Sequence, residues 1–297
     1  MVWKNIIGKK EEMYLAKTIQ ELQNFLYELR KVNKTVGFTP TMGTLHSGHI
    51  SLIKKSIEEC DISVCSIFVN PTQFNQKTDL DKYPRNFNSD SVLLEKAQLT
   101  ILFLPSVEEI YPPNLDTSVK IDFKGLDEKM EGEFRPGHFK GVAQVVNRLL
   151  TIVQPDSIYM GQKDFQQFTI IDFMIKKLKI ETKLVVCPTE REENGLAMSS
   201  RNLRLPPKIR ERAGIINQTL LWAKKNLNKL KVSEIKATSL TNLSIKDFRP
   251  EYFEIINGAT LKPLRYAGNC KYVVACTAVW AGDVRLIDNM ILYHDLN

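Results

Sequence analysis

Short apolar runs that alternate with helical patterns most strongly constrain the fold of this 297-residue chain. Strand-like runs occur at residues 35–38, 62–69, 101–104, 157–160 and 182–186. Segments with helical spacing lie between them, at 18–31, 50–57, 89–97, 142–153 and 165–178. Nearly continuous apolar strands need cover on both faces, and helices in the connections provide it. The pattern predicts an α/β domain with a Rossmann-like, doubly wound parallel sheet.

The pattern changes near Pro188. A long helix is predicted over residues 209–230, and strands are predicted at 252–256, 272–280 and 284–289. Ala281-Gly282-Asp283 separates the last two strands and is typical of a hairpin connection. We therefore predict a first domain at residues 1–188 and a smaller C-terminal α+β domain at residues 189–297.

Composition limits the classes of partner. The chain is 43% hydrophobic and 25% charged, as expected for a globular protein with a full core. Its 41 basic and 34 acidic residues give a net charge of +7, which suits an anionic small substrate as well as nucleic acid. We find no run of five or six like charges, so the sequence does not indicate a dedicated nucleic-acid binder.

Cysteine usage and hydropathy bear on location. The five cysteines include no Cys-x-x-Cys pair, a pattern typical of reduced thiols in a cytoplasmic enzyme. Residues 1–10 contain too short an apolar core for a signal peptide. No apolar stretch approaches the roughly 20 residues that span a bilayer. We predict a cytoplasmic protein without a membrane partner.

The segment 38–49 joins a strand to a helix through a turn that carries two histidines. His46 and His49 flank Gly48 where the helix begins, and a helix N-terminus attracts anions through its unpaired N–H groups. Two imidazoles three residues apart can donate hydrogen bonds to one polyphosphate. We interpret this segment as a phosphate-binding loop.

Two alternatives compete with that interpretation. A histidine pair can be half of a metal site, but zinc needs further ligands, and His138 and His294 lie far away in the sequence. A histidine can also simply cap or pack against the turn. Two histidines directly after a strand make the phosphate interpretation the stronger one.

Polar residues follow two further strands. Asn70 and Gln73 come after the second strand and offer amides to hydroxyl or carboxylate groups. Ligands of open parallel sheets bind at the carboxyl ends of the strands, so these amides are expected beside the histidine loop. An Asn-Pro turn with a surface glutamine is the alternative.

The fourth strand leads into residues 161–167. Gly161 permits close approach of a ligand, Lys163 supplies charge for phosphate, and Asp164 suits a ribose diol. Gln167 lies one helical turn beyond Lys163. A surface ion pair between Lys163 and Asp164 is the alternative.

Residues 195–202 place two hydroxyls and an arginine on a loop just past the proposed boundary. Such a loop suits a flexible clamp for phosphates, with a lid function if the second domain closes over the first. A serine-rich turn is the alternative.

Together these motifs resemble the pantothenate synthetase (pantoate–β-alanine ligase) family, within the His-x-Gly-His nucleotidyltransferase-like superfamily. The matching segments are 40–49, 68–74, 83–85, 135–142, 161–167 and 198–202. The Asn-Pro-x-Gln-Phe and Met-Ser-Ser-Arg-Asn elements are more particular to this family than the histidine element.

The resemblance implies that ATP and (R)-pantoate form pantoyl adenylate and pyrophosphate, after which β-alanine displaces AMP to give pantothenate. The implied catalytic residues are His46, His49, Lys163 and Arg201. The implied ATP-binding residues are Met42, His46, His49, Gly161, Lys163, Asp164, Ser199, Ser200 and Arg201. Pantoate would be held by Gln73, Gln167 and Asn70, with Tyr83, Arg135 and His138 covering the site.

The resemblance also implies partners and moving parts. Mg²⁺ would accompany ATP, with Asp90 at an acidic position near the ion. Residues 1–188 would bind ATP and pantoate, residues 189–297 would form a lid, and residues 75–88 would be a mobile cover. A homodimer is the family expectation.

Two rival functions remain. A sister adenylyltransferase with the same histidine loop would keep the adenylate in its product, but it gives no reason for Gln73 and Gln167 together. A non-catalytic nucleic-acid-binding module would bind with a steep salt dependence and release no AMP.

Overall fold

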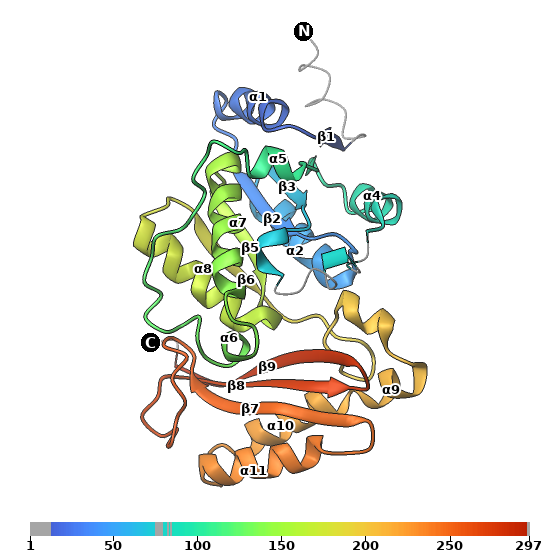
Figure 1. The fold of residues 1–297 in the computed structure, drawn as a ribbon, viewed down its shortest axis with the longest axis vertical. Helices are drawn as coiled ribbons and strands as arrows, with labels where there is room; N and C mark the ends of the chain where they lie inside the picture. The colour runs from blue at the N-terminus through green and yellow to red at the C-terminus, as the bar shows by residue number, and fades with distance from the viewer. Residues whose placement is uncertain (1–12, 75–79, 82, 84, 296–297) are drawn as a thin grey trace. The chain divides into compact units, whose positions relative to one another are not determined.

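The computed structural model of this protein describes residues 13–74, 80, 81, 83 and 85–295 (Figure 1). The predicted lack of a signal peptide concerns residues 1–10 and lies outside this part. The chain divides into two compact units. Unit 1 comprises Met1–Phe123, Arg135–Met160 and Ile170–Cys187, and unit 2 comprises Lys124–Phe134, Gly161–Thr169 and Pro188–Asn297. One division falls at Cys187/Pro188, and two earlier segments also join unit 2.

Unit 1 is built on a six-stranded sheet in the order β1-β4-β3-β2-β5-β6. The strands are β1 (Tyr14–Ala16), β2 (Val36–Thr41), β3 (Ile62–Ile67), β4 (Ile101–Phe103), β5 (Ser157–Gly161) and β6 (Lys183–Cys187). The pairings of β1 with β4, β4 with β3, β3 with β2 and β2 with β5 are all parallel. The predicted Rossmann-like parallel sheet is confirmed.

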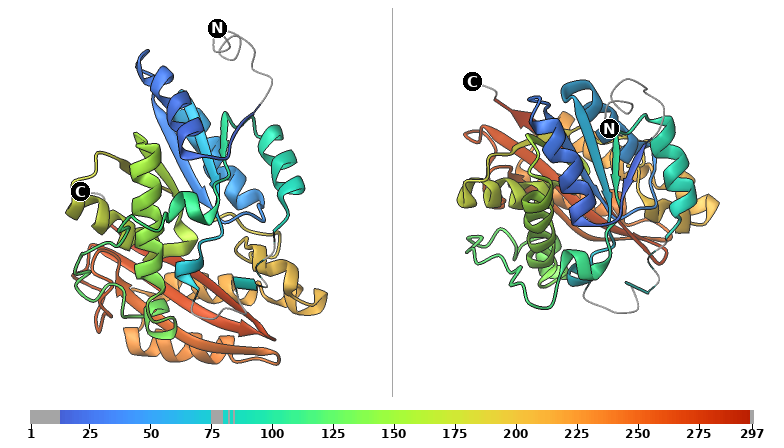
Figure 2. Two further views of the ribbon diagram at one scale, coloured as in Figure 1. Left: turned by 45° about the horizontal axis from the view of Figure 1, so that its top comes forward. Right: turned by 90° about the horizontal axis from the view of Figure 1, so that it is seen from above.

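Helices cover both faces of this sheet (Figure 2). Those of the first unit are α1 (Ile19–Arg30), α2 (Ser47–Glu59), α4 (Phe87–Lys96), α5 (Val107–Ile110), α7 (His138–Val153) and α8 (Phe165–Leu178), of which α8 begins in unit 2. Helices α1 and α7 lie on one face, and α2 and α4 lie on the other. Ile53 of α2 and Leu94 of α4 are fully buried against Cys65 and Leu102 of the sheet. Burial on both faces explains why the strands read as continuous apolar runs.

Unit 2 contains a smaller antiparallel sheet of β7 (Phe248–Asn257), β8 (Tyr272–Ala281) and β9 (Val284–His294). Strands β8 and β9 pair up to Ala281 and Val284, so the predicted hairpin is confirmed. Gly282 in its turn has a φ of +56°, which suits glycine. Helices α10 (Ile215–Asn226) and α11 (Val232–Leu243) pack on one face of this sheet around an apolar core.

The predicted single helix over residues 209–230 is wrong. The chain instead forms α9 (Pro207–Arg212) and α10, with a break between them at Ala213 and Gly214. A Cβ atom on Gly214 would lie 2.2 Å from the carbonyl oxygen of Asn194. The close approach leaves no room for a side chain at residue 214, and Asn194 Nδ2 donates to the Arg210 and Glu211 carbonyls at the end of α9. Helical periodicity cannot reveal these contacts with a distant segment.

Strand β1 and helix α11 were not predicted. β1 has three residues, too few for an alternation pattern, and its pairing with β4 determines it. In α11 serine and threonine interrupt the apolar spacing, and packing against β7 supplies what the pattern lacks. Among the described residues, no helix is both long and apolar enough to cross a membrane.

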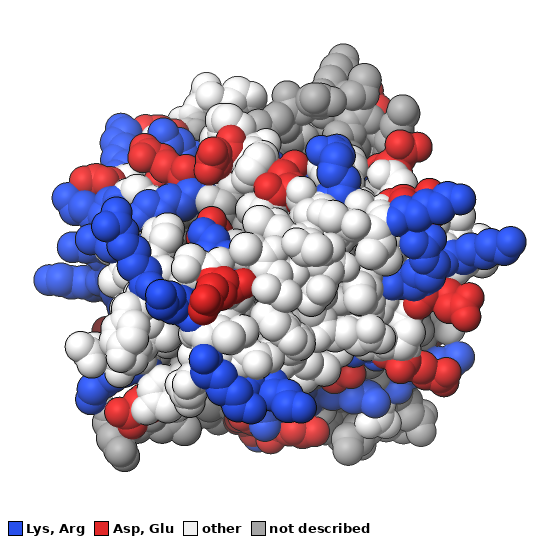
Figure 3. Space-filling view, turned by 90° about the horizontal axis from the view of Figure 1, so that it is seen from below, with Lys and Arg blue, Asp and Glu red and all other residues white. Residues whose placement is uncertain are grey.

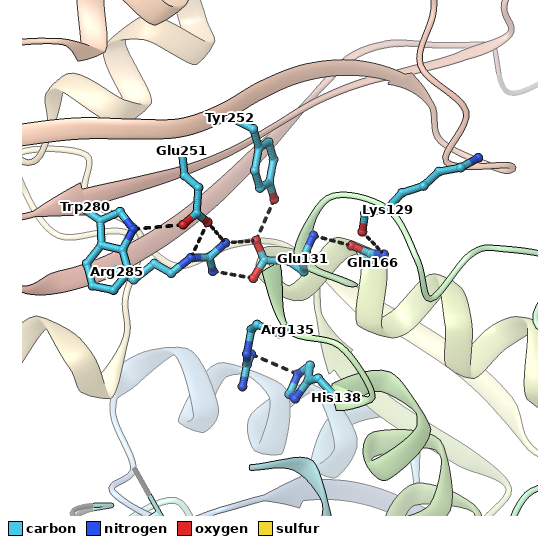
Figure 4. A network of polar contacts seen from close by, with 9 residues as sticks. All are labelled: Lys129, Glu131, Arg135, His138, Gln166, Glu251, Tyr252, Trp280 and Arg285. Carbon is cyan, nitrogen blue, oxygen red and sulfur yellow. Dashed lines mark hydrogen bonds and ion pairs between the residues drawn. The ribbon is translucent and has the colours of Figure 1, made fainter. Parts of the chain in front are cut away.

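The second face of the unit 2 sheet holds segment 124–134 through buried charges (Figure 4). The Arg285 guanidinium on β9 donates to Glu131 of α6 (Glu131–Phe134) at 2.6 and 2.9 Å and to Glu251 of β7 at 2.6 and 2.8 Å. The Tyr252 hydroxyl donates to Glu131 at 2.8 Å, and the Trp280 indole donates to Glu251 at 3.0 Å. Each carboxylate is therefore paired and hydrogen-bonded, as burial of a charge requires.

Gln166 joins the same segment to the start of α8. Its Nε2 atom donates to the carbonyl oxygens of Leu126 and Lys129 at 2.7 and 2.8 Å, and its Oε1 atom accepts from the Glu131 N–H at 3.1 Å (Figure 4). These contacts explain why residues 124–134 and 161–169 belong to unit 2 although both precede Pro188 in the chain.

Arg285→Met should lower the free energy of unfolding by about 3–5 kcal/mol, because it leaves two buried carboxylates without their cation. Denaturant unfolding measures the loss. Arg265→Met makes the same change at an exposed position and should leave stability close to wild type. Equal effects of the two substitutions would contradict the structural role of the Arg285 cluster.

Candidate active site

The loop between β2 and α2 is organised by its two histidines. His46 is the N-cap residue of α2, and its Nδ1 atom accepts a hydrogen bond from the Gly48 N–H at 3.1 Å. The Nδ1 atom of His49 accepts from the His46 N–H at 3.3 Å, and the two rings lie 4.0 Å apart. The capping alternative is thus realised.

Capping also fixes the chemistry of the rings. Because Nδ1 of each imidazole accepts a backbone N–H, the neutral ring carries its proton on Nε2. Both histidines then present an Nε2–H donor at the N-terminal end of α2. Capping and anion binding are therefore compatible in this loop.

Asp90 of α4 holds the backbone of the same loop. Its carboxylate accepts from the Thr44 N–H at 2.8 Å and from the Leu45 N–H at 2.7 Å, and its side chain is 2% exposed. Gly43 and Thr44 have φ values of +81° and +54°, a left-handed stretch that is costly for threonine. Asp90 stabilises this conformation.

Asn70 and Gln73 lie together after β3: Asn70 caps the short helix η2 (Pro71–Gln73), and Gln73 is its last residue. Asn70 Nδ2 donates to Gln73 Oε1 at 3.0 Å, and Gln73 Nε2 donates to the Met42 sulfur at 3.0 Å. Tyr111 donates its hydroxyl to Asn70 Oδ1 at 2.8 Å, and burial raises the pKa of Tyr111. The amides predicted beside the histidine loop are thus joined to it through Met42.

Helix α7 approaches η2 closely at Gly141. A Cβ atom on Gly141 would lie 2.3 Å from the Thr72 carbonyl oxygen, and the Gly141 carbonyl accepts from Asn70 at 3.2 Å. His138 of α7 bonds the Gln73 carbonyl through Nδ1 at 2.9 Å and Arg135 through Nε2 at 3.0 Å. Since arginine only donates, His138 accepts at Nε2 and carries its proton on Nδ1 (Figure 4). Arg135 and His138 therefore support the Gln73 backbone.

Half of the implied cover, residues 75–88, lies outside the described residues, since 75–79, 82 and 84 are not described. Tyr83 is described, and its ring packs edge-on against Phe74 at 5.7 Å between centroids.

In unit 2, residues predicted to bind the nucleotide follow β5, together with Gln167, which is predicted to bind pantoate. Gly161 ends the strand, Lys163 and Asp164 form the short helix η3 (Gln162–Asp164), and Gln167 lies in the first turn of α8. All four are partly exposed. Asn289 of β9 holds the backbone carbonyls of Gln162 and Lys163 at 2.9 and 2.8 Å.

Residues 190–204, which contain the loop predicted as a phosphate clamp, are connected by backbone and side-chain hydrogen bonds. Arg191 bridges to Ala197, and the Met198 N–H donates to the Glu190 carbonyl at 2.9 Å. Ser199 caps η4 (Ser200–Arg204) by accepting from the Arg201 N–H at 3.2 Å. Asn202 ties this helix back to Glu192 at 2.7 Å. The backbone bridge and the buried Asn202 side chain therefore connect the two ends of this segment.

The structure thus brings Met42, His46, His49 and Asp90 together around one loop, with Asn70 and Gln73 joined to it. The predicted residues of unit 2 lie at the end of β5, on η3, at the start of α8 and beside or on η4. Sequence reasoning missed Tyr111, Asn289 and the loop-holding role of Asp90, because none of them belongs to a local motif. In the described part of the chain, no three His, Cys, Asp or Glu side chains are grouped to hold a metal.

The charge on the surface is mixed. In the view of Figure 3, Lys and Arg gather toward the margins among Asp and Glu, and the centre of the face is largely uncharged.

A parallel α/β unit with a histidine-capped helix after a central strand is the arrangement of an α/β protein that binds phosphate at a helix N-terminus. The family model of Pantoate-beta-alanine ligase matches residues 14–291. Pantothenate synthetases of Azobacteroides pseudotrichonymphae and Bacteroides fragilis are 49% and 47% identical, covering 94% of this chain and 99% and 98% of their own.

Solved structures agree with the sequence comparisons. Pantothenate synthetase from Thermus thermophilus superposes with a TM-score of 0.88 at 38% identity, covering 95% of this chain and 100% of that one. Pantoate-beta-alanine ligase from Francisella tularensis, complexed with beta-gamma ATP and beta-alanine, gives 0.77 at 35% identity, with 95% and 98% covered. This chain belongs to the pantoate–β-alanine ligase family. The family and enzyme class predicted from the sequence are confirmed.

Asp90→Asn should lower the free energy of unfolding by roughly 1–3 kcal/mol, because the new amide NH₂ group faces a backbone N–H that loses its acceptor. Ligase activity should fall by the same factor, relative to the wild type, at every Mg²⁺ concentration. Denaturant unfolding and a Mg²⁺ titration of activity measure both effects. Glu95→Gln, at an exposed position of the same helix, is the matched control. Recovery of activity at high Mg²⁺ would instead favour a metal-binding role for Asp90.

Proposed function

We propose that this protein condenses (R)-pantoate with β-alanine, using ATP and passing through a pantoyl adenylate, with its own residues in the roles set out below. The observation that carries this proposal is the histidine-capped loop joined through Met42 to Asn70 and Gln73, in a chain that matches the ligase family over residues 14–291.

In unit 1, the N-terminal end of α2 would hold phosphate. Its first-turn N–H groups and dipole favour negative charge, and the Nε2–H donors of His46 and His49 add directional hydrogen bonds. The Met42 backbone would contact ATP beside them. Asp90 keeps the loop in the conformation that presents these groups.

In unit 2, the phosphates would be bound by Lys163, Ser199, Ser200 and Arg201, and the ribose by Gly161 and Asp164. A lysine supplies a compact point charge, and an arginine supplies paired donors for phosphate oxygens. Ser199 supports this role, because by accepting the Arg201 N–H it fixes the backbone from which the arginine side chain projects. The role of residues 189–297 as a lid belongs to the same proposal.

Pantoate would be held by the amides of Gln73 and Gln167, with Asn70 fixing Gln73. The hydrogen bond from Asn70 to Gln73 Oε1 orients the Gln73 amide. Its Nε2 group therefore points to the Met42 sulfur in the histidine loop. Arg135 and His138 support the Gln73 backbone, and Tyr83 would help to cover the site.

The chemistry requires no protein nucleophile. The pantoate carboxylate attacks the α-phosphate, and the enzyme aligns two anions and stabilises the charge that grows on pyrophosphate. His46, His49, Lys163 and Arg201 would supply this stabilisation. β-Alanine then attacks the acyl carbon of the adenylate as a neutral amine, and AMP leaves.

Three further parts of the proposal concern Mg²⁺, the cellular compartment and the homodimer. Mg²⁺ would arrive with ATP and bind mainly phosphate and water oxygens, as this ion prefers. Asp90 is the acidic residue that the family resemblance implies near the ion, and its carboxylate accepts the Thr44 and Leu45 N–H groups. The five cysteines, free in the described structure, suit a reducing cytoplasm. The homodimer is tested by measuring the mass of the purified protein by light scattering.

A mass-resolved assay with ATP, Mg²⁺ and pantoate, with and without β-alanine, tests the reaction. AMP and pantothenate should accumulate only when every component is present. Turnover of another acid in place of pantoate would overturn the substrate, and an adenylated end product would favour the sister adenylyltransferase.

Loss of one side chain that donates hydrogen bonds to the phosphates should slow adenylate formation by about 10²–10³-fold, as expected for one preorganised donor. His46→Ala and Lys163→Ala test this in single-turnover measurements. His46→Asn is the matched variant, because asparagine retains an N-cap acceptor for α2 but lacks the Nε2–H donor. It should unfold like the wild type and still lose activity. Rates like the wild type in His46→Asn or Lys163→Ala would contradict the assigned roles.

A further inference from the structure

Two consecutive residues of β9, Asp288 and Asn289, are polar and almost fully buried, at 4% and 2% exposure. Successive side chains of a strand point to opposite faces of the sheet. Asp288 shares its face with Leu286 and Leu292 of the apolar core, and Asn289 shares the other face with Arg285. Each must therefore be satisfied by a different segment of unit 2.

Asn289 is satisfied by η3. Its Nδ2 atom donates to the carbonyl oxygens of Gln162 at 2.9 Å and Lys163 at 2.8 Å, and its Oδ1 atom accepts from Gln162 Nε2 at 3.3 Å. Both amide hydrogens are thus used on consecutive carbonyls at the point where β5 ends and α8 has not yet begun. Among side chains of this size, asparagine alone offers two such hydrogens and an acceptor.

Asp288 fixes the backbone from which Asn289 projects. Its Oδ1 atom accepts from the Asn289 N–H at 2.8 Å, and its carboxylate binds the Arg191 guanidinium at 2.6 and 3.0 Å. Burial raises the pKa of Asp288, and the paired guanidinium opposes this effect. Arg191 in turn donates to the Gly195 carbonyl at 3.0 Å. The Asn289 amide is therefore held on a rigid support.

We propose that Asn289 is a positioning residue for Lys163: it fixes the backbone of η3 so that the lysine ammonium meets the phosphates of ATP. This proposal rests on the phosphate-binding role proposed for Lys163. Both amide hydrogens of Asn289 are bonded to the carbonyls of Gln162 and Lys163, so the residue acts on the reaction through the backbone of η3. A misplacement of about 1 Å in a group that aligns a substrate can cost about 10²-fold in rate.

Asn289→Asp replaces the two donors with a carboxylate that faces two carbonyl oxygens. In the full-length protein, this change should lower kcat for pantoyl adenylate formation about 10²-fold, with a smaller change in the KM for pantoate. Asn228→Asp makes the same change at an exposed position of unit 2 and should leave kcat unchanged. Asn289→Ala removes the donors without adding charge and replaces Asn289→Asp if that protein does not fold.

A double-mutant comparison separates positioning from general damage. If Asn289 acts through Lys163, the same substitution should cost little further activity in a Lys163→Ala background. Losses that multiply in full, or an unchanged kcat in the single variant, would overturn this proposal alone. An unaffected Lys163→Ala enzyme would overturn the role of Lys163 and, with it, the proposal for Asn289.

Discussion

The N-terminal end of α2 is the constraint on which the unit 1 site depends. A parallel sheet places this end of the helix at the carboxyl edge of β2, where the chain must reverse within a few residues. Gly43 and Thr44 make the reversal with left-handed backbone dihedrals, which are costly for threonine. Asp90 offsets this cost by accepting hydrogen bonds from the N–H groups of Thr44 and Leu45. This backbone path brings the His46 and His49 rings within reach of the N–H groups at the start of α2. Asn70 and Gln73 are placed relative to the same loop through Met42.

Unit 2 uses the two faces of its small sheet differently. One face packs on α10 and α11 through apolar side chains, as in any half-covered antiparallel sheet. The other carries Arg285 and Asn289, which bind Glu131 of segment 124–134 and the carbonyls of η3. Polar groups on this second face attach parts of the chain that come earlier in the sequence. Buried hydrogen bonds to charges and carbonyls are directional, so they fix these segments in one register.

Local motifs made much of the site predictable. The histidines, Asn70 and Gln73 lie within a few residues of strand ends, so strand–helix periodicity alone placed them at one edge of the sheet. Asp90 was noticed for its charge, but its partners lie 45 and 46 residues away, and a sequence pattern does not reveal such pairs. Tyr111 and Asn289 escaped for the same reason, since they contact Asn70 and Lys163 at separations of 41 and 126 residues.

By itself, the sequence determined the parallel α/β architecture, the antiparallel end and the family, because periodicity and short motifs are local properties of the chain. Tertiary structure decided where the helix after Pro207 breaks, which segments join unit 2, and which nitrogen of each imidazole carries the proton. These features depend on close approaches between distant segments, such as Asn194 against Gly214. Steric fit and hydrogen-bond direction exist only once those segments have met.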